Sequence, residues 1–171
     1  MPRNLELKAP LSSSYAGAAI ARSLGARRTN RFYHTDTYFN IPSGRLKLRE
    51  FRGNSRSQLI WYIRPNTRGV RISQYAIAPV QDTRETRKIL SRLFGVQVVV
   101  RKRRDLFILN NARIHLDRIA GLGNFVEFEV IVRYGIPQAK HLMNVLKTAF
   151  SVRQRDCIGT SYCTMLMNRT R

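Results

Sequence analysis

The chain has 171 residues, of which 31 are Lys or Arg and 10 are Asp or Glu, so its formal net charge is +21. This length fits one domain, which we expect to span residues 1–171, and a hydrophobic content of 43% excludes a disordered chain. No apolar run approaches the ~18–20 residues that a membrane-spanning helix requires. The charge indicates an anionic partner, with nucleic acid, polyphosphate and an acidic membrane surface as candidates.

The cysteines and the N-terminal residues favour the cytoplasm. Cys157 and Cys163 have neither the spacing of a metal-binding pair nor the number expected of a disulfide framework. We interpret them as ordinary half-buried thiols, which suit a reducing compartment. The N-terminal residues lack the apolar segment of a secretory signal.

The first half of the chain predicts short strands with one helix among them. Leu5-Glu6-Leu7-Lys8 has the two-residue period of a strand. Residues 12–24 predict a helix with a serine N-cap and a stop at Gly25. Further strands are expected at residues 33–39, 45–49, 58–64 and 70–77.

The second half continues the pattern. Asp82 and Glu85 have the spacing of a capping box for a helix that ends at Gly95. Strands are expected at 96–104, 105–109, 114–119 and 125–132, and helices at 137–150 and 159–168. Short turns favour antiparallel pairing, and closure removes open edges. The fold class is therefore α+β: a closed eight-stranded antiparallel β-barrel with helices packed outside.

Charged side chains recur on one face of the expected strands. Arg45, Lys47 and Arg49 share a face, and Leu46 and Leu48 share the other. An open sheet could turn such faces to water. A barrel covered by helices needs apolar residues outside, so its charged faces would line the lumen. A lumen rich in Lys and Arg then requires an anion, and linked phosphates fit.

The scarce acids refine this interpretation. Glu6, Asp117, Glu127 and Glu129 lie on the charged faces of their strands. Carboxylates are unsuited to simple anion capture, but they bind Mg²⁺ or Mn²⁺ together with substrate phosphates. The alternative is that these acids form salt bridges with the neighbouring bases. The three histidines show no metal-ligand spacing, so no zinc site is expected.

Several segments, taken in order, resemble the CYTH superfamily, the triphosphate tunnel metalloenzymes, and most closely its class IV adenylyl cyclase-like branch. The resemblance depends on NLELKA (4–9), HTDTYFNIPSGRLKLRE (34–50), LIWYIRP (59–65), RISQY (71–75), VVVRKRRDLF (98–107), RIHLDRIAGLGNFVEFEV (113–130) and the C-terminal IGTSYCTML. It spans nearly the whole chain and implies an eight-stranded tunnel that binds a triphosphate end-on.

The resemblance also implies roles for particular residues. The family signature Glu-x-Glu-x-Lys reads Asn4-Leu5-Glu6-Leu7-Lys8, with Asn in place of the first Glu. The metal, Mg²⁺ or Mn²⁺, would be held by Asn4, Glu6, Glu127 and Glu129. Lys8 and Asp117 would assist catalysis. The substrate-binding set would be Arg45, Lys47, Arg49, Arg64, Arg71, Lys102 and Arg104.

Three functions remain open. A cyclase would convert ATP to cyclic AMP and pyrophosphate, whereas a triphosphatase would hydrolyse a nucleoside, thiamine or inorganic triphosphate. A non-catalytic polyphosphate or RNA binding protein would use the surplus surface charge, although no RNA-binding motif is visible. The oligomeric state is also open, with a homodimer as one alternative. That surplus charge includes Arg27, Arg28, Arg52, Arg56, Arg84, Arg87, Arg92, Arg153, Arg155, Arg169 and Arg171.

Overall fold

The computed structural model describes residues 3–53 and 56–169, so Arg171 lies outside the described residues. Within these ranges the chain alternates strands and helices in the order expected from the sequence. The elements are β1 (Arg3–Pro10), α1 (Ser14–Ser23), β2 (Arg27–Phe39), β3 (Arg45–Phe51), β4 (Ser57–Ile63), β5 (Arg71–Val80), α2 (Thr83–Phe94), β6 (Val96–Leu109), β7 (Ala112–Ile119), β8 (Gly123–Ile131), α3 (Ile136–Ala149), the 3₁₀ turn η1 (Gln154–Asp156) and α4 (Tyr162–Met167).

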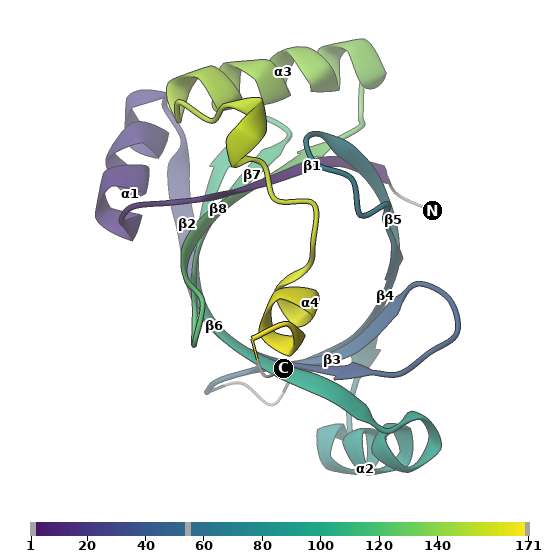
Figure 1. Ribbon diagram of the computed structural model, residues 1–171. Helices are drawn as coiled ribbons and strands as arrows, with labels where there is room; N and C mark the ends of the chain where they lie inside the picture. Colours follow the sequence, from purple (N-terminus) through teal and green to yellow (C-terminus); the bar gives the residue numbers. More distant parts are fainter. Residues whose placement is uncertain (1–2, 54–55, 170–171) are drawn as a thin grey trace.

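The strands close into a barrel in the order β1-β5-β4-β3-β2-β6-β7-β8. Each strand pairs antiparallel with its neighbours, and β8 pairs with β1 to complete the ring. Figure 1 looks along the barrel and shows this closure. The predicted fold class, a closed eight-stranded antiparallel barrel with helices outside, is confirmed across the described part of the chain.

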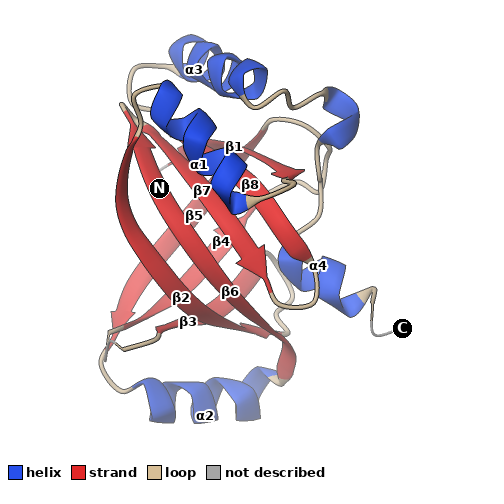
Figure 2. Ribbon diagram, turned by 90° about the vertical axis from the view of Figure 1, so that its left-hand side faces the viewer, coloured by secondary structure: helices blue, strands red, loops and turns tan. Residues whose placement is uncertain are grey.

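The main hydrophobic core lies between the barrel wall and two helices, outside the lumen. Leu7, Ile114 and Phe128 point outward from β1, β7 and β8 and are fully buried. They belong to one apolar cluster with Met143 and Leu146 of α3. Figure 2 shows α1 and α3 against this side of the barrel. Because the period of two places apolar residues outside, it directs the charged residues of the same strands inward.

Local signals explain most element boundaries. The Ser13 hydroxyl accepts a hydrogen bond from the Ala16 amide, and the Asp82 carboxylate accepts one from the Glu85 amide, so both predicted N-caps are present. Gly95 ends α2 with a φ of 68°, a left-handed conformation that favours glycine.

Several boundaries differ from the expectation, and β5 continues to Val80 where residue 77 was the expected end. β2 begins at Arg27, well before residue 33, because it pairs with β6 from Arg27↔Ile108 to Phe39↔Val96. For the same reason β6 is one continuous strand and not two. The last helix covers only Tyr162–Met167, since the amide of Ile158 bonds to the Lys8 carbonyl and keeps the preceding segment extended.

Two smaller findings complete the fold. Both cysteines are free thiols, as expected, but they are buried, whereas half-buried side chains were predicted. None of the helices in residues 3–53 and 56–169 is long and apolar enough to cross a membrane.

Candidate active site

A cavity of about 420 Å³ occupies the barrel lumen. Its walls carry ionic side chains from β1, β3, β6, β8 and the residue that follows β4, and they include Glu6, Lys8, Lys47, Arg49, Arg64, Lys102, Arg104, Glu127 and Glu129. These are the side chains that the two-residue period assigned to the charged faces. The structure therefore brings three of the four predicted acids and most of the predicted bases into one cavity.

Asp36 of β2 organises one group of bases. Its carboxylate accepts hydrogen bonds from Lys47 Nζ at 2.9 Å and from Arg49 Nε and Nη2, both at 2.7 Å. Lys102 Nζ lies 3.6 Å away. Burial alone would raise the pKa of Asp36, but Arg49, Lys47 and Lys102 outweigh burial and hold it well below its usual value. Sequence reasoning missed Asp36, although it shares a strand face with Tyr38.

Arg104 and Asp117 form a second buried group. Arg104 Nε and Nη2 donate to the two carboxylate oxygens of Asp117, each at 2.6 Å, and Nη2 also lies 2.8 Å from Glu127 Oε2. The Tyr162 hydroxyl from α4 donates to Asp117 at 2.9 Å. Burial raises the pKa of Asp117, but Arg104 and Lys102 overcome this effect and lower it. Asp117 thus holds Arg104 in place and lies behind the cavity wall.

Four acidic or imidazole side chains face one another on β1, β7 and β8. The strand register sets Glu6 opposite Glu129 and His115 opposite Glu127. One ligand atom each from His115, Glu127 and Glu129 lies within 4.8 Å of the others. Burial, followed by repulsion from Glu129 and Glu127, raises the pKa of Glu6. This group, Glu6, His115, Glu127 and Glu129, is called the acidic cluster below.

Spacing among the three histidines gives no signal for His115 as a ligand. The informative signal was the strand period, which places His115 on the same face as Asp117, and the β7–β8 register, which brings it to Glu127. Only the folded barrel supplies that register.

The acidic cluster fits a divalent cation. The Asn4 side-chain oxygen lines the same cavity and is buried without a hydrogen-bond partner in the described structure. A buried carbonyl oxygen without a partner is costly, so a ligand at this position would satisfy it. Oxygen donors suit Mg²⁺, and a mixed set of oxygens and one imidazole suits Mn²⁺. Glu6 and Glu127 also accept from Arg64 and Arg104 at 2.9 and 2.8 Å.

Lys8 connects the acidic cluster to α4. Its ammonium group is almost fully buried, 3.7 Å from Glu127 Oε1 and 3.7 Å from the centre of the Tyr162 ring. Burial lowers the pKa of Lys8 to about 8. Lys8 is therefore mostly protonated at neutral pH, but its pKa lies only slightly above neutral pH.

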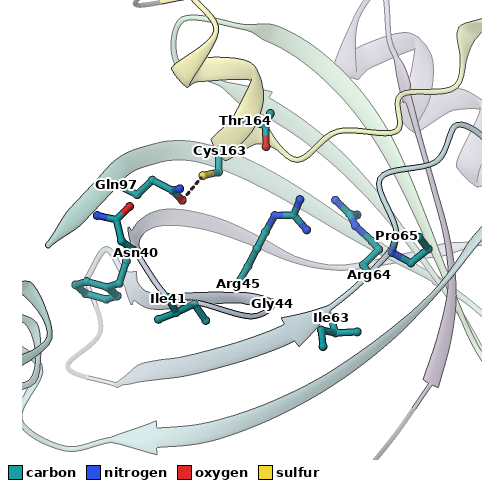
Figure 3. Close-up of a pocket in the computed structure, with 11 residues that line it drawn as sticks. Asn40, Ile41, Gly44, Arg45, Ile63, Arg64, Pro65, Gln97, Cys163 and Thr164 are labelled. Atoms are coloured by element: carbon teal, nitrogen blue, oxygen red, sulfur yellow. Dashed lines mark hydrogen bonds between the residues drawn. The ribbon is translucent and has the colours of Figure 1, made fainter. Parts of the chain in front are cut away.

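Two predicted substrate-binding residues lie apart from the lumen cavity. Arg45 lines a neighbouring pocket of about 560 Å³ beside α4 and donates to the Asn66 side chain at 2.6 Å. Figure 3 shows Arg45 and Arg64 extending into this pocket. Arg71 is buried and donates to the Ile158 carbonyl at 2.8 Å, so it anchors the C-terminal segment. Arg64 lines both cavities.

Aromatic rings line another part of the lumen cavity. Phe32 stacks on His34 with ring centres 5.3 Å apart, and Phe51 meets His34 edge-on at 4.8 Å. His34 is buried, and neither ring nitrogen has a hydrogen-bond partner within the described residues. Burial, with Arg49 and Lys102 nearby, lowers the pKa of His34 well below its usual value. A neutral imidazole offers one donor and one acceptor.

The fold and the lumen define a closed β-tunnel protein whose interior can hold an anion beside a cation site. The chain belongs to the CYTH family, because the sequence model of the CYTH domain matches residues 2–135. The resemblance seen in the sequence is therefore confirmed at the level of the family.

Solved structures share this fold. PH1012 from Pyrococcus horikoshii is 22% identical, with 94% of this chain and 98% of that chain covered and a TM-score of 0.83. A candidate adenylate cyclase from Vibrio parahaemolyticus is 17% identical (96% and 97% covered, TM-score 0.76). HpAC1 from Hippeastrum, a candidate adenylyl cyclase with a dominant triphosphatase activity, is 13% identical (99% and 96% covered, TM-score 0.67). Comparison with curated proteins gave no match.

Proposed function

We propose that this protein performs metal-dependent phosphoryl chemistry on ATP bound in the tunnel, forming cyclic AMP and pyrophosphate. The observation that carries the proposal is the placement of the acidic cluster and the basic side chains around one cavity in the barrel lumen. A basic lining alone would serve anion capture. Carboxylates beside it are what a cation bridging phosphate oxygens requires.

The basic residues would hold the triphosphate. Lys47, Arg49 and Lys102 converge on Asp36, so their charges are already directed to one region of the lumen. Arg104 would add a further contact, positioned by its paired bonds to Asp117. Fixed donors of this kind stabilise charge as it develops on the departing pyrophosphate. Arg45 and Arg71 would act only at the edge of the site.

Asn4, Glu6, Glu127 and Glu129, together with His115, would hold the divalent ion. When bound, the ion would neutralise phosphate charge and orient the reacting group. Lys8, next to Glu127, would contact a phosphate oxygen while protonated. In the proposed reaction the ribose 3′-oxygen bonds to the α-phosphorus as the bond from that phosphorus to the bridging oxygen breaks. The hydroxyl proton leaves to solvent or to a nearby base.

The aromatic part of the cavity supports a nucleoside triphosphate over an inorganic one. Phe32 and Phe51 offer apolar ring surface, and aromatic rings prefer stacked or edge-on partners such as a base. The unpartnered nitrogens of His34 would donate to and accept from the edge of that base. An inorganic triphosphate would leave them unsatisfied.

A triphosphatase is the second candidate. HpAC1 shares the fold and has a dominant triphosphatase activity. Hydrolysis needs nearly the same phosphate and metal contacts, with water replacing the ribose hydroxyl as nucleophile.

Product analysis separates these functions. The protein would be incubated with ATP, GTP, thiamine triphosphate or inorganic triphosphate, with Mg²⁺ or Mn²⁺, and the products resolved by chromatography. Cyclic AMP with pyrophosphate supports the cyclase, and inorganic phosphate supports the triphosphatase. Glu127→Gln should abolish either activity, which excludes a contaminating enzyme. Binding without turnover of any substrate would overturn both and leave a non-catalytic binding protein.

A further inference from the structure

Arginines gather on the outer face of the wall formed by β2, β6 and β7. Along β6, Arg101 and Arg103 face outward, whereas Lys102 and Arg104 are buried in the lumen. Arg103 lies opposite Arg118 of β7 in the strand register. This basic face is therefore on the other side of the wall from the tunnel, and the tunnel chemistry leaves it unexplained.

A groove of about 1010 Å³ runs over this face. Glu50 lines the groove but is already held by Arg87 at 2.9 Å. The carboxylate of Asp105, beside the groove, forms ion pairs with Arg28 at 2.9 Å, with Arg31 at 2.8 Å and with Arg103 at 3.9 Å. These acids leave most of the positive charge unmatched. The groove residues that carry the argument are Tyr33, Arg52, Arg101, Arg103, Arg118 and Arg169.

Tyr33 gives the groove a flat apolar surface among the charges. Its side chain is 45% exposed, and the Arg52 guanidinium carbon lies 6.0 Å from the centre of its ring. Aromatic rings within a positively charged groove are the recurring means of binding single-stranded nucleic acid, because bases stack on the ring and phosphates meet the cations. A simple polyphosphate would make no use of the ring.

We propose that this groove binds single-stranded nucleic acid, with the arginines on backbone phosphates and Tyr33 beneath an unstacked base. A duplex keeps its bases stacked and could not present one to Tyr33. An acidic membrane surface would be met by apolar side chains that project outward, whereas this groove is hollow and has five arginines among its lining residues.

The test is fluorescence anisotropy with a labelled single-stranded RNA of about 15 nucleotides, close to the upper site size of one barrel-sized module. The RNA carries a 5′-hydroxyl, so that it offers no triphosphate to the tunnel. If about four phosphates are contacted, the logarithm of the affinity should fall with the logarithm of salt concentration with a slope near −3. The triple variant Arg101→Gln, Arg103→Gln, Arg118→Gln should reduce that slope by about 2. Tyr33→Ala should weaken binding about tenfold and leave the slope unchanged.

A matched variant controls for net charge. Arg84→Gln, Arg92→Gln and Arg155→Gln remove the same charge from exposed positions outside the groove and should retain wild-type affinity. Circular dichroism and the melting temperature verify that every variant is folded. Equal losses in the two triple variants would overturn the proposal, as would competition by excess inorganic triphosphate, which would place the RNA in the tunnel. Binding to phosphatidylserine vesicles without RNA binding would overturn it in favour of a membrane surface.

Discussion

The ammonium group of Lys8 lies 3.7 Å from the centre of the Tyr162 ring, so the first strand and the last helix of the structure meet inside the barrel. The same ring packs on Phe125 with centres 5.2 Å apart, and its hydroxyl donates to Asp117 at 2.9 Å. One side chain of α4 thus lines the lumen cavity and contacts both Lys8 and Asp117. The C-terminal segment is therefore part of the site.

Replacing Tyr162 with Phe should destabilise the protein by about 2 kcal/mol, because it removes a buried hydrogen bond to a charged carboxylate. The ring contacts with Lys8 and Phe125 remain. Urea denaturation followed by circular dichroism measures the change in the free energy of unfolding. Tyr15→Phe is the matched control, since Tyr15 is 84% exposed and its variant should unfold like the wild type. Equal stability of Tyr162→Phe and the wild type would contradict the prediction.

The fold could be predicted largely from alternation. The pattern of Arg45 to Arg49 identified a strand and also which of its faces is charged, because side-chain direction follows directly from the period of two. The sequence predicts two successive strands that meet between Arg104 and Asp105. In the structure the pairing of β6 with β2 continues across this point. Pairing between segments so far apart in the sequence cannot be predicted from the local pattern of residues.

The site was predictable to the extent that its residues share strand faces. Asp36 shares the inward face of β2 with His34 and Tyr38, and the same period applied to that strand predicts its direction. The period also places His115 beside Asp117, but its approach to Glu127 depends on the β7–β8 register. The positions of Arg45 and Arg71 could not be found in this way. Their partners, Asn66 and the Ile158 carbonyl, lie outside the strands, where no periodic pattern reports side-chain direction.

Asp36→Asn should destabilise the protein by about 3–5 kcal/mol, because it leaves the buried Lys47 and Lys102 and the partly buried Arg49 without their shared counter-charge. Inorganic triphosphate should restore part of that loss by supplying negative charge among the same bases, so the melting temperature should rise more in the variant than in the wild type. Differential scanning fluorimetry measures both effects. Asp82→Asn should change little, since Asn caps a helix as well as Asp does. A variant that the anion does not stabilise would argue against phosphate binding at Asp36.

His115→Asn should lower the affinity for Mn²⁺ by at least about tenfold while affecting Mg²⁺ less, because it replaces the single imidazole of the acidic cluster. Electron paramagnetic resonance of unbound Mn²⁺ gives the affinity directly and needs no enzymatic activity. His141→Asn, at an exposed position on α3, is the matched control. Unchanged Mn²⁺ binding in His115→Asn would exclude the imidazole as a ligand.

Asn4→Glu should raise the affinity for Mg²⁺ by about tenfold, because it adds a carboxylate at the buried, unpartnered oxygen of Asn4. If Asn4 limits metal binding, metal-dependent turnover should increase together with the affinity for Mg²⁺. Isothermal titration calorimetry measures the binding, and Asn144→Glu on the exposed side of α3 controls for the added charge. An unchanged affinity would mean that Glu6, Glu127 and Glu129 already suffice.

The affinity for metal-free ATP should decrease as the pH rises above about 8, where Lys8 loses its proton in the unliganded protein. A bound phosphate favours the protonated amine, so binding above this pKa must take up a proton, and the affinity falls by up to about tenfold per pH unit. Lys8→Arg keeps the charge throughout this range, and its affinity should stay level where that of the wild type falls. Calorimetry from about pH 7 to about pH 10, on either side of the Lys8 titration, measures both profiles. The same decline in the two proteins would assign the titration to another group and remove Lys8 from the phosphate site.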